Sequence, residues 1–252
     1  MEYKIYKIND TTWRIEEYDE LMSVYMYLLI GKDKALLLDT GMGMIPLDRI
    51  VNELTNLPLE VLNTHGHFDH TGGNNIFETV YMHRADEEVY NFHFSLKMQN
   101  IFSMYNFPTQ KQDVTFITED MEFELGGRKL SLILVPGHSP GSLCILDETN
   151  HVLYSGDACC KAPVLLNIDY ATSVSTYLES IKHLKTYSNQ FTITWPSHHS
   201  VPVEPEIIDQ FLECGREICE DNSRGNDIQG MFYESKSHKY KDVSIEFFKN
   251  NI

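Results

Sequence analysis

The stretch His65-Gly66-His67-Phe68-Asp69-His70 carries four potential metal ligands within six residues. It follows a partly apolar run, residues 59–64, that is typical of a strand. Imidazole and carboxylate groups suit zinc and similar ions at neutral pH. Side chains alternate along extended backbone. We therefore expect His65 and His67 to project to one side, and Asp69 and His70 to project past them. The pattern therefore indicates two adjacent metal ions, each holding two of these side chains.

Two ions need more ligands than one segment supplies, and three further segments offer them. Pro136-Gly137-His138-Ser139-Pro140-Gly141 places a histidine in a turn after an apolar run. Gly156-Asp157 and Pro196-Ser197-His198-His199 follow two other short strand-like runs. Each unit thus consists of a predicted strand and a ligand at its end.

The motifs HxHxDH, PGHSPG, SGD and PSH, in this order, resemble those of the metallo-β-lactamase superfold hydrolases, from about Asp39 to His198. The resemblance is to the dinuclear-metal branch, which includes glyoxalase II and lactonase-type enzymes. It implies an α+β fold, a four-layer αβ/βα sandwich of two facing mixed β-sheets with outer helices. It also implies seven metal ligands: His65, His67 and His138 on the first ion, Asp69, His70 and His198 on the second, and Asp157 bridging both.

Two of these assignments have alternatives. The family carries an aspartate after a buried strand near its start, and Asp39 fits this position, where it would orient a ligating imidazole. Asp-Thr-Gly at residues 39–41 is also ordinary turn chemistry. His199 is the alternative to His198, because a shift of one residue exchanges the two.

The implied centre is hydrolytic. Two divalent ions, expected to be Zn²⁺ with iron or manganese as alternatives, generate a metal-bound hydroxide that attacks the carbonyl of a small ester, thioester or lactone. Asp69 is expected to act catalytically as well, by orienting the nucleophile or carrying its proton. The alternative functions are a metal-dependent phosphodiesterase or nuclease on the same site, or a β-lactamase-like amide hydrolase.

The composition limits the partners. The 37 acidic and 20 basic residues give a formal charge of −17, which repels phosphate backbones, so we expect a small-molecule substrate and no nucleic acid. No apolar stretch suits a membrane span, and the five cysteines form no CxxC pair, so we expect a cytoplasmic protein with free thiols. Cys159 and Cys160 are interpreted as small buried hydrophobes.

The chain of 252 residues is predicted to be one metallo-hydrolase domain, 1–252. The spacing of apolar residues predicts helices from Pro46 onward, at 173–187 and at 206–220, and a strand at 243–248. A hairpin turn is predicted at 31–33. The aromatic-rich region 85–110 is predicted to be a helical substrate lid, with ordinary core helices as the alternative. The remaining histidines in no motif are assigned no function: His83, His93, His151, His183 and His238.

Overall fold

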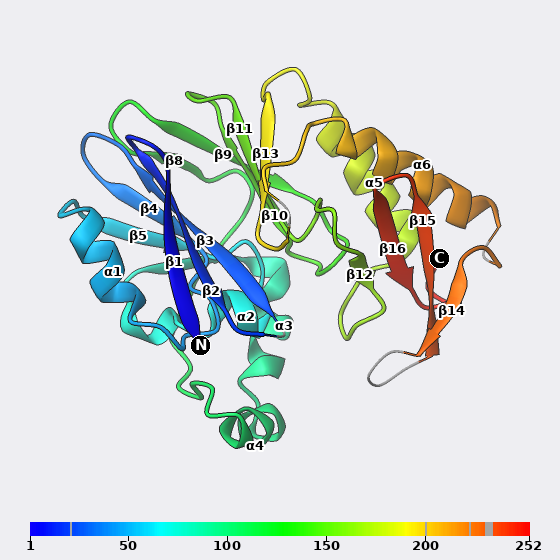
Figure 1. Ribbon diagram of the computed structural model, residues 1–252, viewed down its shortest axis with the longest axis horizontal. Helices are drawn as coiled ribbons and strands as arrows, with labels where there is room; N and C mark the ends of the chain where they lie inside the picture. The colour runs from blue at the N-terminus through cyan, green and yellow to red at the C-terminus, as the bar shows by residue number, and fades with distance from the viewer. Residues whose placement is uncertain (21, 200, 222, 230–233) are drawn as a thin grey trace. The chain divides into compact units, whose positions relative to one another are not determined.

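The computed structural model describes residues 1–20, 22–199, 201–221, 223–229 and 234–252 (Figure 1). The chain forms two compact units, Met1–Ser131 and Leu132–Ile252, and each has a hydrophobic core of its own. The assignment of 1–252 to a single domain stays a prediction. No helix within the described ranges is both long and apolar enough to cross a bilayer.

The first unit is built on a seven-stranded mixed sheet with the strand order β1 to β7. Strands β1 to β4 pair antiparallel, which confirms the predicted hairpin between β3 and β4, and β4 to β7 pair parallel. Because the carboxyl ends of parallel strands meet at one edge, the residues that follow β4 and β5 lie close together. The strands are β1 (Glu2–Asn9), β2 (Thr12–Tyr18), β3 (Ser23–Ile30), β4 (Ala35–Leu38), β5 (Leu59–Leu62), β6 (Val80–His83) and β7 (Thr115–Ile117).

Helix α1 (Leu47–Leu54) begins after Pro46 as predicted and buries Leu47, Ile50 and Val51 in the core of this unit. The predicted helical character of region 85–110 is also confirmed, whereas its role as a lid stays a prediction. The other helical segments are α2 (Phe68–Thr71), η1 (Asn74–Ile76), η2 (Arg84–Asp86), α3 (Glu87–His93) and α4 (Leu96–Met104).

Two further sheets have the orders β13-β11-β10-β9-β8 and β12-β16-β15-β14. The predicted strand near residue 243 is confirmed as β16. The sequence did not predict β14 and β15, because their residues are mostly polar. Strand β15 depends on pairing with β16, and β14 depends on pairing with β15. The strands are β8 (Glu122–Glu124), β9 (Lys129–Leu134), β10 (Leu143–Asp147), β11 (Val152–Gly156), β12 (Val164–Leu166), β13 (Ile193–Pro196), β14 (Asn226–Gln229), β15 (Glu234–Tyr240) and β16 (Val243–Phe247).

Helices α5 (Val174–Lys185) and α6 (Ile207–Glu220) lie side by side in the second unit, with β15 and β16 against α6 (Figure 1). Both helices were predicted, and the Ser173 hydroxyl caps α5 by accepting from Thr176 N at 3.1 Å. All five cysteines are free thiols. Burial raises the pKa of the Cys159 and Cys160 thiols, so both stay protonated, in keeping with small buried hydrophobes.

A buried carboxylate on β2 holds the loop that follows β4. Glu17 is fully buried and accepts hydrogen bonds from Met42 N and Met44 N, both at 2.7 Å. Glycine is required at position 41, where φ is +67° and an added Cβ would lie 2.3 Å from a Glu17 carboxylate oxygen. Glu17 therefore fixes the course of the chain just after Asp39.

Glu17 gives a pH-dependent contribution to stability. Burial raises the pKa of Glu17 above the ordinary value of 4.5. Its contribution to the free energy of unfolding is therefore complete below pH 4.5, and it is lost as the pH rises through the higher pKa of the folded state. The unfolding free energy of wild type minus that of Glu17→Gln is therefore expected to fall from pH 4 to pH 8. Urea denaturation in the presence of a chelator measures this difference. Groups that titrate in the same way in both proteins do not contribute to it. A difference that rises with pH would contradict the assignment.

Candidate metal centre

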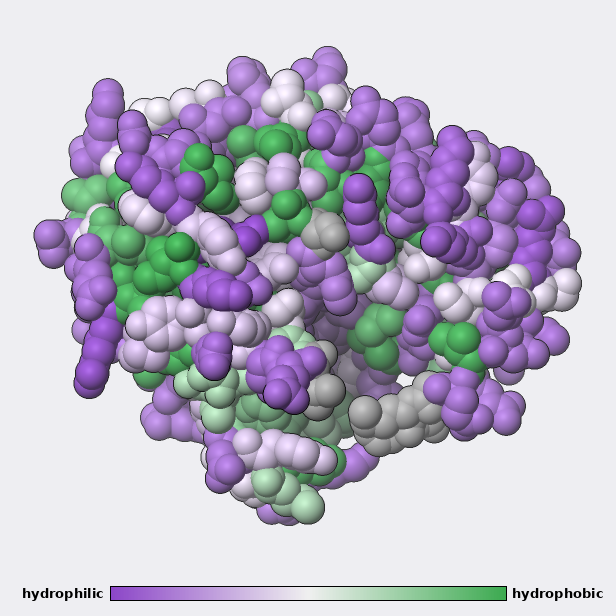
Figure 2. All heavy atoms as spheres, in the orientation of Figure 1, coloured by the Kyte–Doolittle hydropathy of each residue, from purple (hydrophilic) through white to green (hydrophobic). Residues whose placement is uncertain are grey.

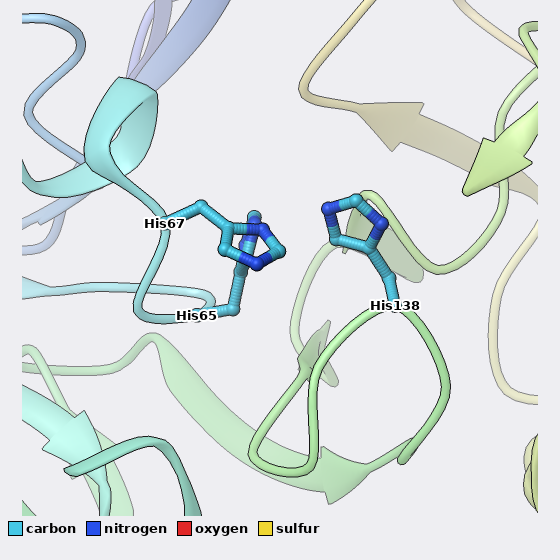
Figure 3. A group of neighbouring side chains, drawn as sticks. All are labelled: His65, His67 and His138. Carbon is cyan, nitrogen blue, oxygen red and sulfur yellow. The ribbon is translucent and has the colours of Figure 1, made fainter. Parts of the chain in front are cut away.

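The loop between β5 and α2 brings the first two predicted ligands together. His65 and His67 both project from this loop (Figure 3), with ring centroids 4.7 Å apart and ligand atoms within 4.8 Å of each other. Both side chains are almost completely buried, with 1% and 5% of their surfaces exposed. Two buried imidazoles at this separation are suited to bind one ion.

The next two ligands lie on α2. The Nε2 atom of His70 is 3.5 Å from Oδ2 of Asp69, and the Nδ1 atom of the same ring is 2.8 Å from Oδ2 of Asp39. A ring whose Nδ1–H donates to a carboxylate presents Nε2 to a metal, so Asp39 selects the tautomer that His70 needs. The His70 ring is fully buried, whereas the Asp69 side chain is 38% exposed and open to solvent.

Asp39 also reaches the other ligand pair through Thr64. Its Oδ1 accepts from Thr64 N at 2.7 Å, and its Oδ2 accepts from the Thr64 hydroxyl at 2.8 Å. The same hydroxyl oxygen lies 3.1 Å from His65 Nδ1. Because its hydrogen is donated to Asp39, this hydroxyl accepts from the imidazole, which again presents Nε2 for coordination. One buried carboxylate thus orients two imidazoles.

The second unit carries the other three predicted ligands, gathered around Asp157. Its Oδ2 atom lies 3.5 Å from Nε2 of His138 and 3.4 Å from Nε2 of His198. A single carboxylate between two imidazoles is the arrangement that a bridging ligand requires. The neighbouring His199 has its ring centroid 6.0 Å from that of His198, so the contact with Asp157 favours His198 over the alternative.

Strand β12 contacts His138, and helix α5 contacts the residue that follows Asp157. Nδ1 of His138, which projects from the loop after β9 (Figure 3), lies 3.0 Å from the Leu165 carbonyl oxygen, so the ring donates there and presents Nε2. The hydroxyl of the fully buried Tyr177 donates to Ala158 O at 2.7 Å, next to Asp157. Burial raises the pKa of Tyr177, which keeps this donor protonated.

The donor atoms have the spacing that a bound ion imposes. Two ligand atoms about 2.1 Å from a tetrahedral zinc ion are roughly 3.4 Å apart. The three pairs in which Nε2 of His70, His138 or His198 faces a carboxylate oxygen are separated by 3.4–3.5 Å. The donor set consists of imidazole and carboxylate groups, which accept zinc, iron or manganese. The residues therefore fit divalent metal binding.

The sequence named the candidate ligands, and it missed several residues that contact or adjoin them. Thr64, the Leu165 carbonyl and Tyr177 carry no motif, and His93 had been assigned no function although its Nδ1 atom accepts from Phe68 N at 2.9 Å. The interactions of Leu165 and Tyr177 join positions 19 or more residues apart. Among these residues, only Thr64 could have been identified from the sequence, because it stands directly before the first candidate ligand.

A family model described as the metallo-beta-lactamase superfamily matches residues 20–192. The chain belongs to this superfamily, and the resemblance drawn from the four motifs is confirmed. A solved metallo-beta-lactamase from Pontibacter korlensis is similar over 85% of this chain and 99% of its own, with a TM-score of 0.66 and 19% identity. That likeness shows the fold, so the predicted α+β class is confirmed as well.

Two curated relatives are similar to part of the chain. The human protein named acyl-coenzyme A thioesterase MBLAC2 is 28% identical over 63% of this chain and 66% of its own length. The chain thus spans just under two thirds of that relative. A Bacillus velezensis protein named probable polyketide biosynthesis zinc-dependent hydrolase BaeB is 25% identical over 73% of this chain and 77% of its own.

Proposed function

We propose that this protein is a metal-dependent hydrolase of small esters, thioesters or lactones, with a centre of two divalent ions. The proposed ligands are His65, His67, Asp69, His70, His138, Asp157 and His198. The observation that carries the proposal is the position of Asp157 Oδ2, which lies 3.4–3.5 Å from the Nε2 atoms of two histidines. Zinc is the proposed metal, and the name of the bacterial relative supports it.

The chain's own residues prepare the centre for hydrolysis. When bound, two divalent ions lower the pKa of water toward neutrality and polarise a substrate carbonyl. Asp39 and the Leu165 carbonyl hold the tautomers of His70 and His138. In this proposal the carboxylate of Asp69, which is partly exposed, accepts a hydrogen bond from the attacking water and takes up its proton.

An aromatic cluster beside the ligands supports an apolar acyl group as part of the substrate. Phe68 stands between ligands His67 and Asp69, and its ring centroid lies 3.9 Å from that of Phe102 and 5.3 Å from that of Phe107. Apolar rings of this kind bind acyl chains by removing them from water. The thioesterase named among the relatives acts, by that name, on acyl thioesters, which favours a thioester here.

A substrate panel with metal-loaded and chelator-treated protein tests the proposal. We expect hydrolysis of acyl thioesters, and of simple esters or lactones at lower rates, only in the metal-loaded protein. Metal analysis of protein purified without added ions is expected to find two equivalents. Turnover of bis(p-nitrophenyl) phosphate without any thioester hydrolysis would overturn the proposal in favour of a phosphodiesterase. Turnover of a β-lactam alone would favour an amide hydrolase.

A further inference from the structure

The ligand loop that carries His67 is held from two sides by the segment that follows β6. Gly66 N donates to Oδ2 of the fully buried Asp86 at 2.7 Å, and Phe68 N donates to Nδ1 of His93 at 2.9 Å. These two backbone groups stand immediately before and after His67. Asp86 is the last residue of η2 and the N-cap residue of α3, and His93 is the last residue of α3. The two ends of α3 therefore hold the backbone on either side of His67.

The loop also packs tightly against this helix. A Cβ added at Gly66 would lie 3.1 Å from Asp86 O and from Tyr90 N, so only glycine permits the approach without displacement. The rings of His67 and His93 are stacked, with centroids 5.3 Å apart and an interplanar angle of 24°. The direction of the His67 ring is therefore set by contacts on its backbone and on its face.

We infer that Asp86 and His93 are positioning residues that aim His67 at its metal ion and couple that ligand to α3 and α4. Both act through His67, so the inference rests on the proposed metal centre. A metal ligand holds its ion tightly only when its ring is preorganised, and residues that orient ligands typically contribute 10–100-fold to metal affinity. A carboxylate that accepts from Gly66 N and an imidazole that accepts from Phe68 N supply this preorganisation.

The coupling extends from the ligand loop to the surface. Phe102 of α4 packs on Phe68, whose own backbone N–H is the one held by His93. Helix α4 buries no residue among those described, and Leu96 and Met104 are 79% and 80% exposed. In Figure 2 this helix lies at the lower edge of the view, where pale green and white residues reach the surface. The packing of Phe102 on Phe68 therefore connects α4 with the backbone that carries His67.

Substitution of His93 tests the inference through metal affinity, which does not require knowledge of the substrate. In His93→Ala we expect one of the two zinc ions to be held 10–100-fold more weakly against a chromophoric chelator, and the other to be unchanged. In His93→Asn the Oδ1 atom replaces Nδ1 as the acceptor from Phe68 N, so affinity is expected to recover to within a few-fold of wild type. His238→Ala is the control, since His238 is also half-buried but its Nε2 pairs with Glu217.

The Co²⁺-substituted protein provides a second measurement. The d–d absorption of one cobalt ion is expected to change in His93→Ala and to return in His93→Asn. If His93→Ala does not fold, Asp86→Ala with Asp86→Asn as its rescue repeats the comparison on the other side of His67. Wild-type affinity for both ions in the alanine variants, or equal weakening of both ions without rescue, would overturn the inference. Failure of wild type to bind metal would instead overturn the proposed function.

Discussion

Asp157→Ala is expected to lower the metal content from two equivalents to one or fewer and to reduce kcat/KM by about 10³-fold. The carboxylate faces Nε2 of both His138 and His198, so its removal takes a ligand from each ion at once. Loss of two-ion stabilisation of the transition state costs several kcal/mol, and about 4 kcal/mol corresponds to ~10³ in rate. Elemental analysis and thioester kinetics measure the two effects.

Asp147→Ala is the matched control for this experiment. Asp147 is a fully buried aspartate at the end of β10 in the same sheet, whereas Asp157 is partly exposed. Asp147 holds a turn by accepting from Asn150 N at 3.0 Å and from Asn150 Nδ2 at 2.8 Å. Its loss is expected to lower the melting temperature while both ions remain bound. Two retained ions in Asp157→Ala, with wild-type turnover, would exclude Asp157 as the bridging ligand.

Asp39→Ala is expected to lower the affinity for both metal ions by 10–100-fold and to lower the free energy of unfolding by about 3–5 kcal/mol. This carboxylate pairs with His70, accepts from Thr64 N and the Thr64 hydroxyl, and is 1% exposed. Its removal leaves buried donors without an acceptor. Asp39 also has φ of +62°, a conformation that asparagine adopts readily and alanine does not. Asp39→Asn is therefore expected to fold better than Asp39→Ala while still weakening metal binding.

Thr64→Val separates the effect of Asp39 on His65 from its effect on His70. Valine has nearly the same shape but lacks the hydroxyl that connects Asp39 with His65, whereas the pair between Asp39 and His70 stays intact. Chelator competition is expected to show weakening of the ion bound by His65 only. Two results would contradict this role of Asp39: an equal loss of affinity for both ions in Thr64→Val, or unchanged affinity for both ions in Asp39→Asn. Asp39 would then be a turn residue without a role in orienting the ligands.

The candidate ligands were predictable because each stands in a local motif. HGHFDH at 65–70 contains four donors within six residues, and glycine and proline around His138 mark the turn that carries it. The helices α1, α5 and α6 were equally accessible, since their apolar residues recur at helical spacing. The polar strands β14 and β15 were not predictable, because their own residue pattern does not indicate strands: β15 is held by pairing with β16, and β14 by pairing with β15.

The amino-acid order by itself determined the candidate metal ligands, the strands they follow and the superfamily, because all of these depend on neighbours along the chain. The resemblance to the superfamily indicated Asp39 as an orienting residue, whereas tertiary structure alone showed which side chains it contacts. Asp39 contacts His70 across 31 positions, and His93 contacts Phe68 across 25. Such contacts arise only when strands and helices pack, and no spacing in the sequence specifies them. The stacking of His93 on His67 and the buried position of Asp86 belong to this second class, which is why Asp86 and His93, unlike Asp39, emerged only from the folded chain.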